Sequence, residues 1–196
     1  MGENWPVDEV GSAFAQVMEL LQGTTGFKFG EEEMRNTPKR VAKMYLELIA
    51  NQTELKMEAD AILSKVFECN SREMVVMSNI RSVGLCPHHL LPIHYKVHVA
   101  YIPDRVVIGA SKFPRLVKLL GRQPLMQETY TSQIADMITE HLKPKGVGTI
   151  VRGVHGCMKS RGVKEHSSEM VTSAMRGVFL TEAHAKQEFL SLLNTK

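Results

Sequence analysis

The residues best suited to chemistry in this chain are Cys86 and His89, spaced as Cys-x-x-His, and a later segment, His155-Gly156-Cys157. Zinc in proteins binds cysteine sulfur and histidine nitrogen, and a catalytic zinc keeps three protein ligands and one open position. Cys86, His89 and Cys157 would supply three ligands if the loop after Cys86 faces the end of the strand that precedes Cys157. The spacing therefore predicts a metal site suited to hydrolysis.

Two further histidines, His88 and His155, adjoin the predicted ligands. Histidine transfers protons near neutral pH, so both are candidates for acid–base catalysis. The alternative is a structural zinc with four ligands, one of them His88 or His155. A zinc deaminase is excluded because the chain lacks that family's His-x-Glu and Pro-Cys-x-x-Cys motifs. No Walker or Rossmann glycine loop is present, so lysine and arginine side chains would have to hold any phosphate.

Hydrophobic periodicity and turn signals indicate the elements that position these residues. Helices are expected over 7–21 with Gly23 as the stop, from Asn36-Thr37-Pro38 onward, within 55–66, after Ser111 as N-cap, over 126–142 and over 183–193. Strands are expected over 74–83, 94–102, 147–154 and 170–180, with 106–110 returning as a hairpin beside 94–102. This order predicts an α+β fold, an antiparallel sheet with helices on one face. Cys86 to His89 would lie in a loop between strands. His94 and His98, four residues apart on one strand, are interpreted as packing residues.

Length and composition bound the protein further. With 196 residues, the chain is expected to form a single functional domain, in which an N-terminal helical region (1–70) packs on a catalytic region (71–196). A formal net charge of +3 argues against nucleic acid as a partner. No apolar run is long enough for a membrane span and the N-terminus does not resemble a signal peptide, so a cytoplasmic protein is expected.

Motifs distributed along the chain resemble those of GTP cyclohydrolase I, type IA. These are the metal motif at Cys86, Ser111-Lys112-Phe113-Pro114-Arg115, Gln127-Glu128, and the segment from His155 to Gly162. The resemblance runs in register from Thr37 to Leu190.

The resemblance implies roles for individual residues. It implies zinc as cofactor, bound by Cys86, His89 and Cys157, with His88 and His155 transferring protons. Glu128, with Gln127 beside it, would bind the guanine edge, and Ser111 would lie near the ribose. The triphosphate would be bound by Lys112, Arg115, Arg161 and Arg40.

The resemblance also implies an activity and an assembly. GTP would be opened at C8 of its imidazole ring, formate would leave, and the product would be 7,8-dihydroneopterin triphosphate, which feeds folate or another pterin pathway. The implied fold is the tunnelling fold (T-fold), in a homo-oligomer, usually a decamer, whose active sites lie between subunits.

One position departs from the family pattern, because Pro87 stands where the family usually has glutamate. A tolerated substitution that stiffens the loop is favoured because the other matched positions are intact. The alternative is a non-catalytic or altered-specificity paralogue that binds purine nucleotides. Glu128 argues against an adenine substrate, which offers no matching pair of donors.

Overall fold

The computed structural model describes residues 6–194 and divides the chain into two compact units, Met1–Ala50 and Asn51–Lys196. Within residues 6–194, no helix combines the length and apolar character needed to cross a membrane.

The N-terminal unit is a pair of helices, α1 (Val7–Thr25) and α2 (Glu31–Leu48). They pack through stacked rings of Phe14 and Tyr45, whose centroids are 5.4 Å apart. The predicted start of α1 at Val7 is confirmed, but its predicted C-terminal end and the predicted start of α2 were wrong. Helix α1 continues past Gly23 to Gly26, whose φ of +74° suits a C-terminal cap. Helix α2 begins seven residues before Pro38, because three glutamates in its first turn favour an N-terminus there and the helix tolerates the proline inside it.

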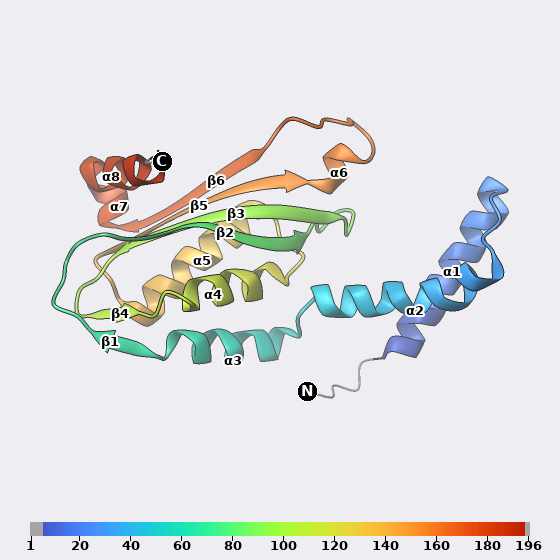
Figure 1. Cartoon of the computed structure of the whole chain (residues 1–196), viewed down its shortest axis with the longest axis horizontal. Coiled ribbons are helices and arrows are strands. Elements are labelled where there is room, and N and C mark those ends of the chain that lie inside the picture. Colours follow the sequence, from blue (N-terminus) through green and yellow to red (C-terminus); the bar gives the residue numbers. More distant parts are fainter. Residues whose placement is uncertain (1–5, 195–196) are drawn as a thin grey trace. The chain divides into compact units, whose positions relative to one another are not determined.

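The C-terminal unit is built on a four-stranded antiparallel sheet (Figure 1). Its strands, in spatial order, are β2 (Val75–Leu85), β3 (Pro92–Ile102), β5 (Gly146–His155) and β6 (Met170–Gly177). The predicted hairpin partner of β3 was wrong. Strand β4 (Val106–Ile108) pairs instead with β1 (Val66–Glu68), because β2 and β5 already occupy both edges of β3.

Helices α4 (Lys112–Gly121) and α5 (Gln127–Leu142) cover one face of this sheet (Figure 1). The ring of Tyr95 on β3 stacks on Tyr130 of α5, with centroids 4.7 Å apart, and the Tyr130 hydroxyl donates to Val117 O at 2.8 Å. Helix α3 (Gln52–Leu63), predicted within 55–66, packs against α4 and α5. The alternation of β3 is confirmed on this face, where Tyr95, Val97, Val99 and Tyr101 are buried.

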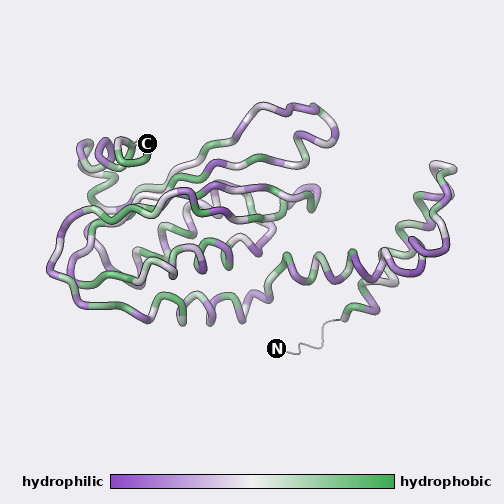
Figure 2. Tube along the Cα trace, in the orientation of Figure 1, coloured by the Kyte–Doolittle hydropathy of each residue, from purple (hydrophilic) through white to green (hydrophobic). Residues whose placement is uncertain are grey.

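The C-terminal helices α7 (Val178–Thr181) and α8 (Ala183–Asn194) pack on the opposite face of the sheet. Phe179 and Phe189 contact Ala100 and Ile150 there. The prediction that the last strand reaches Leu180 was wrong, because the chain turns at Gly177, whose φ is +57°. Figure 2 shows the hydrophilic connection between β5 and β6, which contains the short helix α6 (Gly156–Lys159).

Candidate metal centre and nucleotide site

The structure brings the three predicted metal ligands together. One ligand atom from each of Cys86, His89 and Cys157 lies within 4.8 Å of the others. Cys86 follows β2, while Cys157 follows β5, whose His155 is in register with Ile93 of β3. The antiparallel register therefore brings two segments about 70 residues apart in sequence to one end of the sheet.

A tight turn holds His89 next to Cys86. The carbonyl oxygen of Cys86 accepts hydrogen bonds from the backbone N–H groups of His89 (3.4 Å) and Leu90 (2.8 Å). Pro87 occupies the second position of this turn, where a fixed φ near −65° is favourable and no N–H is required. The substitution at Pro87 therefore fits the backbone of the loop.

Gly156 allows the second metal-binding segment to approach the first. A Cβ atom at Gly156 would lie 2.7 Å from the backbone oxygen of Pro92, closer than real Cβ contacts permit. Only glycine between His155 and Cys157 lets the end of β5 pass this close to the start of β3.

The electrostatics of the two thiols suit a cation. Burial raises the pKa of the Cys157 thiol, and the neighbouring sulfur of Cys86 raises it further. Two adjacent thiolates repel each other, and a divalent metal removes that penalty by binding both. Two sulfurs and one imidazole nitrogen also match the donor types that zinc prefers, so the residues present fit this ion.

A buried amide fixes the orientation of His155. Gln127, at the start of α5 and only 1% exposed, accepts a hydrogen bond from His155 Nε2 through its Oε1 at 2.9 Å. Its amide nitrogen lies 3.1 Å from Val151 O, 2.9 Å from Met170 O and 3.1 Å from Thr172 Oγ1. Because the two carbonyl oxygens can only accept, they require the NH₂ group, so His155 carries hydrogen on Nε2 and turns Nδ1 away from Gln127.

Gln127 was predicted beside the guanine-binding carboxylate, but its amide is occupied by protein partners. Glu128 next to it is exposed on the first turn of α5. Burial lowers the pKa of His155, while the charge of Glu128 raises it. His88 is exposed, with its Nδ1 3.8 Å from Cys86 Sγ.

The structure separates three other predicted residues from this cluster. Ser111, Lys112 and Arg115 lie at the start of α4, where Phe113 packs on Tyr101 near the far end of β3, with centroids 5.7 Å apart. The nine-residue step from Pro92 to Tyr101 corresponds to about 30 Å of strand. Figure 1 shows the β2–β3 turn and α6 at one end of the sheet and β4, which precedes α4, at the other. The predicted residues of the C-terminal unit therefore lie at two opposite ends of one sheet.

The side chains of Ser111, Arg161 and Arg40 are all exposed. Ser111 occupies the N-cap position of α4 without the predicted capping hydrogen bond from its side chain. Arg161 is exposed in the connection after α6, at the metal end of the sheet. Arg40 is exposed on α2 in the N-terminal unit. Within residues 6–194, no acidic side chain pairs with Lys112, Arg115 or Arg161.

Sequence reasoning missed the small residues that shape the site. A Cβ at Gly153 would collide with Gln127 Oε1 and lie 3.3 Å from His155 Nε2, so this glycine makes room for the Gln127–His155 hydrogen bond. Thr172 supports Gln127 from β6. Gly153, two residues before His155, was the only local sequence signal for this hydrogen bond. Its role could not be inferred without knowing how the strands pair.

Comparison with known proteins gives a consistent result. The family model described as GTP cyclohydrolase I matches residues 13–194. GTP cyclohydrolase 1 of Campylobacter curvus is 43% identical over 164 residues, covering 84% of this chain and 85% of that protein. GTP cyclohydrolase 1 of Campylobacter jejuni strain RM1221 is 40% identical, covering 93% and 95%, and that of Clostridium perfringens strain ATCC 13124 is 37% identical, covering 90% and 94%.

A solved structure, the apo form of archaeosine synthase QueF-Like, aligns with a TM-score of 0.47 and 18% identity, covering 55% of this chain and 97% of that one. Sequence similarity over nearly the whole chain decides the assignment. The chain belongs to the GTP cyclohydrolase I family.

Proposed function

We propose that this protein is a zinc-dependent GTP cyclohydrolase, which opens the imidazole ring of GTP, releases C8 as formate and rearranges the product to 7,8-dihydroneopterin triphosphate. The observation that carries the proposal is the convergence of three ligand atoms within 4.8 Å, next to a histidine held by a buried amide. A paralogue that only binds nucleotides would not need His155 fixed in this way.

Cys86, His89 and Cys157 would hold the zinc. When bound, zinc supplies Lewis acidity that activates water for attack at C8. His155 keeps its Nε2 hydrogen in the bond to Gln127, so Nδ1 is the nitrogen that takes up a proton from solvent and, in the resulting imidazolium, delivers it to the guanine imidazole ring. His88, exposed beside Cys86, is the second proton-transfer group in this proposal.

Substrate recognition divides between base and phosphates. The exposed carboxylate of Glu128 can accept two hydrogen bonds from the guanine ring N–H and the exocyclic amine. Gln127, fully engaged with protein groups, acts through His155 rather than on guanine. Lys112, Arg115 and Arg161, with Arg40, are the proposed triphosphate ligands, and arginine binds phosphate oxygens in a forked geometry.

The separation between the metal cluster and the start of α4 supports an active site that is shared between copies. About 30 Å of strand lies between the metal cluster and the start of α4, more than one nucleotide can span. Ser111, Lys112 and Arg115 of one copy would therefore complete the metal end of another copy. Within residues 6–194, the edge strands β2 and β6 have no outer partner, and pairing between copies would satisfy them. A homo-oligomer, with a decamer as the specific expectation, follows from the proposal.

The function is tested by incubating the metal-free and the zinc-reconstituted protein with GTP while formate and pteridine fluorescence are followed together. The proposal expects both products only with zinc, and neither from Cys157→Ser. A matched Cys69→Ser variant, which lacks a thiol outside the cluster, should retain both. GTP binding without any formate from the zinc-loaded protein would support the nucleotide-binding paralogue instead.

A further inference from the structure

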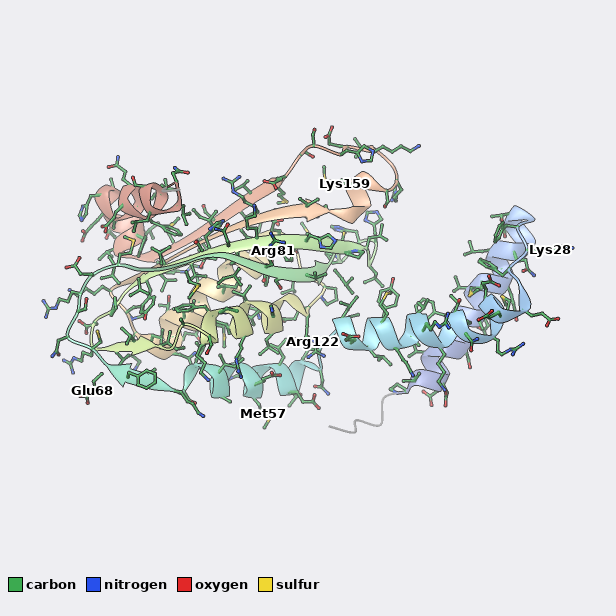
Figure 3. All side chains as sticks on the ribbon, in the orientation of Figure 1. Lys28, Met57, Glu68, Arg81, Arg122 and Lys159 are labelled. Carbon is green, nitrogen blue, oxygen red and sulfur yellow. The ribbon has the colours of Figure 1, made fainter. Side chains whose placement is uncertain are left out.

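Three cations form a row across the face of the sheet that α4 and α5 do not cover. Arg81 of β2 is in register with Lys96 of β3, and Lys96 is in register with Arg152 of β5. Lys96 lies between Tyr95 and Val97, which are buried against the helices, so the row is on the opposite face. All three side chains are exposed, and Arg81 lies near the middle of the sheet (Figure 3).

The row is poorly neutralised within the chain. Arg152 approaches Glu169 at 3.7 Å, with both side chains about half exposed. Among the residues that the structure describes, no acidic side chain pairs with Arg81 or Lys96. Like charges directly opposite one another on neighbouring strands are destabilising, so this arrangement costs stability unless an anion binds.

A buried histidine lies on the same face of the sheet. His98 is two residues from Lys96 on β3 and is 7% exposed. Its Nδ1 accepts a hydrogen bond from the backbone N–H of Asn79 at 3.4 Å, at the irregularity in β2 where Asn79 has a φ of +58°. The imidazole hydrogen therefore resides on Nε2. Burial lowers the pKa of His98, and the charges of Arg152 and Lys96 lower it further.

We propose that Arg81, Lys96 and Arg152 form a binding site for an oligophosphate, separate from the metal cluster. Neighbouring strands are about 4.8 Å apart, so the outer two cations are about 10 Å apart. A single phosphate contacts two adjacent cations at most, whereas a chain of two or three phosphates bridges the whole row. The ligand is therefore an inorganic oligophosphate or the phosphate chain of a nucleotide, which share this chemistry.

The site is tested by protection of Lys96 from an amine-reactive reagent, quantified by peptide mass spectrometry on the full chain. Inorganic triphosphate should slow modification of Lys96 at least severalfold, and orthophosphate at the same ionic strength should not. Lys118, exposed on α4, is the internal control. Protection by GTP equal to that by triphosphate identifies the phosphate chain as the recognised group, and stronger protection by GTP identifies a nucleotide ligand.

Calorimetry with matched variants gives a second readout. Triphosphate is titrated into two triple variants. The first, Arg81→Gln/Lys96→Gln/Arg152→Gln, removes the row, and the second, Arg72→Gln/Lys118→Gln/Lys186→Gln, is the control that removes the same net charge elsewhere. The site is supported if the affinity of one binding event falls at least tenfold in the first variant and not in the second. Equal weakening in both variants overturns it. Protection of Lys96 that depends on protein concentration without added phosphate also overturns it, because another copy then covers this face.

Discussion

Single residues decide whether the metal cluster forms and how it acts. Sequence spacing was sufficient to identify Cys86, His89 and Cys157, because a short loop and one strand end bring them together. It was not sufficient for Gln127, whose role depends on contacts with β5 and β6 that no local pattern encodes. The contributions of the metal-binding loop and of Gln127 can each be measured in variants.

Pro87→Ala should lower the free energy of unfolding by about 0.4–1 kcal/mol, because alanine restores conformational freedom to the unfolded loop. Turnover of GTP should stay within about twofold of wild type, since no hydrogen bond of the turn uses position 87 as a donor. Thermal unfolding and steady-state kinetics check both values, and Pro144→Ala serves as a loop-proline control. A large gain in activity from Pro87→Glu would contradict this account and show that proline impairs the site.

Gln127→Met should lower kcat about 10- to 100-fold with little change in KM, because His155 loses the partner that orients it. Gln123→Met is the matched control, since Gln123 is a buried glutamine that bonds Leu120 O and Gln133 rather than His155. Steady-state kinetics separate the two constants. An increase in KM at constant kcat would mean that Gln127 binds substrate directly.

At the scale of elements, local patterns predicted the long helices and the central strands, and long-range pairing decided the rest. The alternation in β3 and the periodicity of α5 report burial directly, so both elements were found. Strand β4 was assigned to the wrong partner because a turn signal cannot reveal that β3 already has two neighbours. The separation between Cys86 and Ser111 likewise follows from the length of β3 and the direction of α4.

Strand β3 also carries a predicted pH dependence. Burial depresses the pKa of His98, with a further contribution from Arg152 and Lys96. The unfolded chain therefore binds a proton that the folded chain resists, so stability falls as pH drops below the ordinary histidine pKa of about 6.5. Denaturant unfolding between pH 8 and pH 5 should show a smaller loss of stability in His98→Asn than in wild type.

His155, whose pKa burial also depresses, accounts for a part of the slope that remains in that variant. His94→Asn, on the same strand face, measures the effect of removing a histidine by itself. A wild-type slope in His98→Asn would contradict the assignment of this dependence to His98.

At the scale of the whole molecule, the proposed active site would be complete only between two copies, and this predicts complementation between them. Cys157→Ser lacks the metal end and Lys112→Gln/Arg115→Gln lacks the phosphate end, so each variant alone should be nearly inactive. Co-assembly of the two from a denatured or co-expressed mixture should restore roughly a quarter of wild-type turnover, the fraction of interfaces that unite two intact halves in a random mixture. Activity from Lys112→Gln/Arg115→Gln alone would place the complete site within one chain.

The most direct test of the central claim is the fate of C8. GTP labelled with ¹³C at C8 is incubated with the zinc-loaded protein and followed by NMR. We expect all of the label to appear in formate, with one formate for each pterin formed, and we expect His155→Ala to slow the appearance of label in formate greatly. Label retained in an intact purine ring or in the pterin product would contradict it.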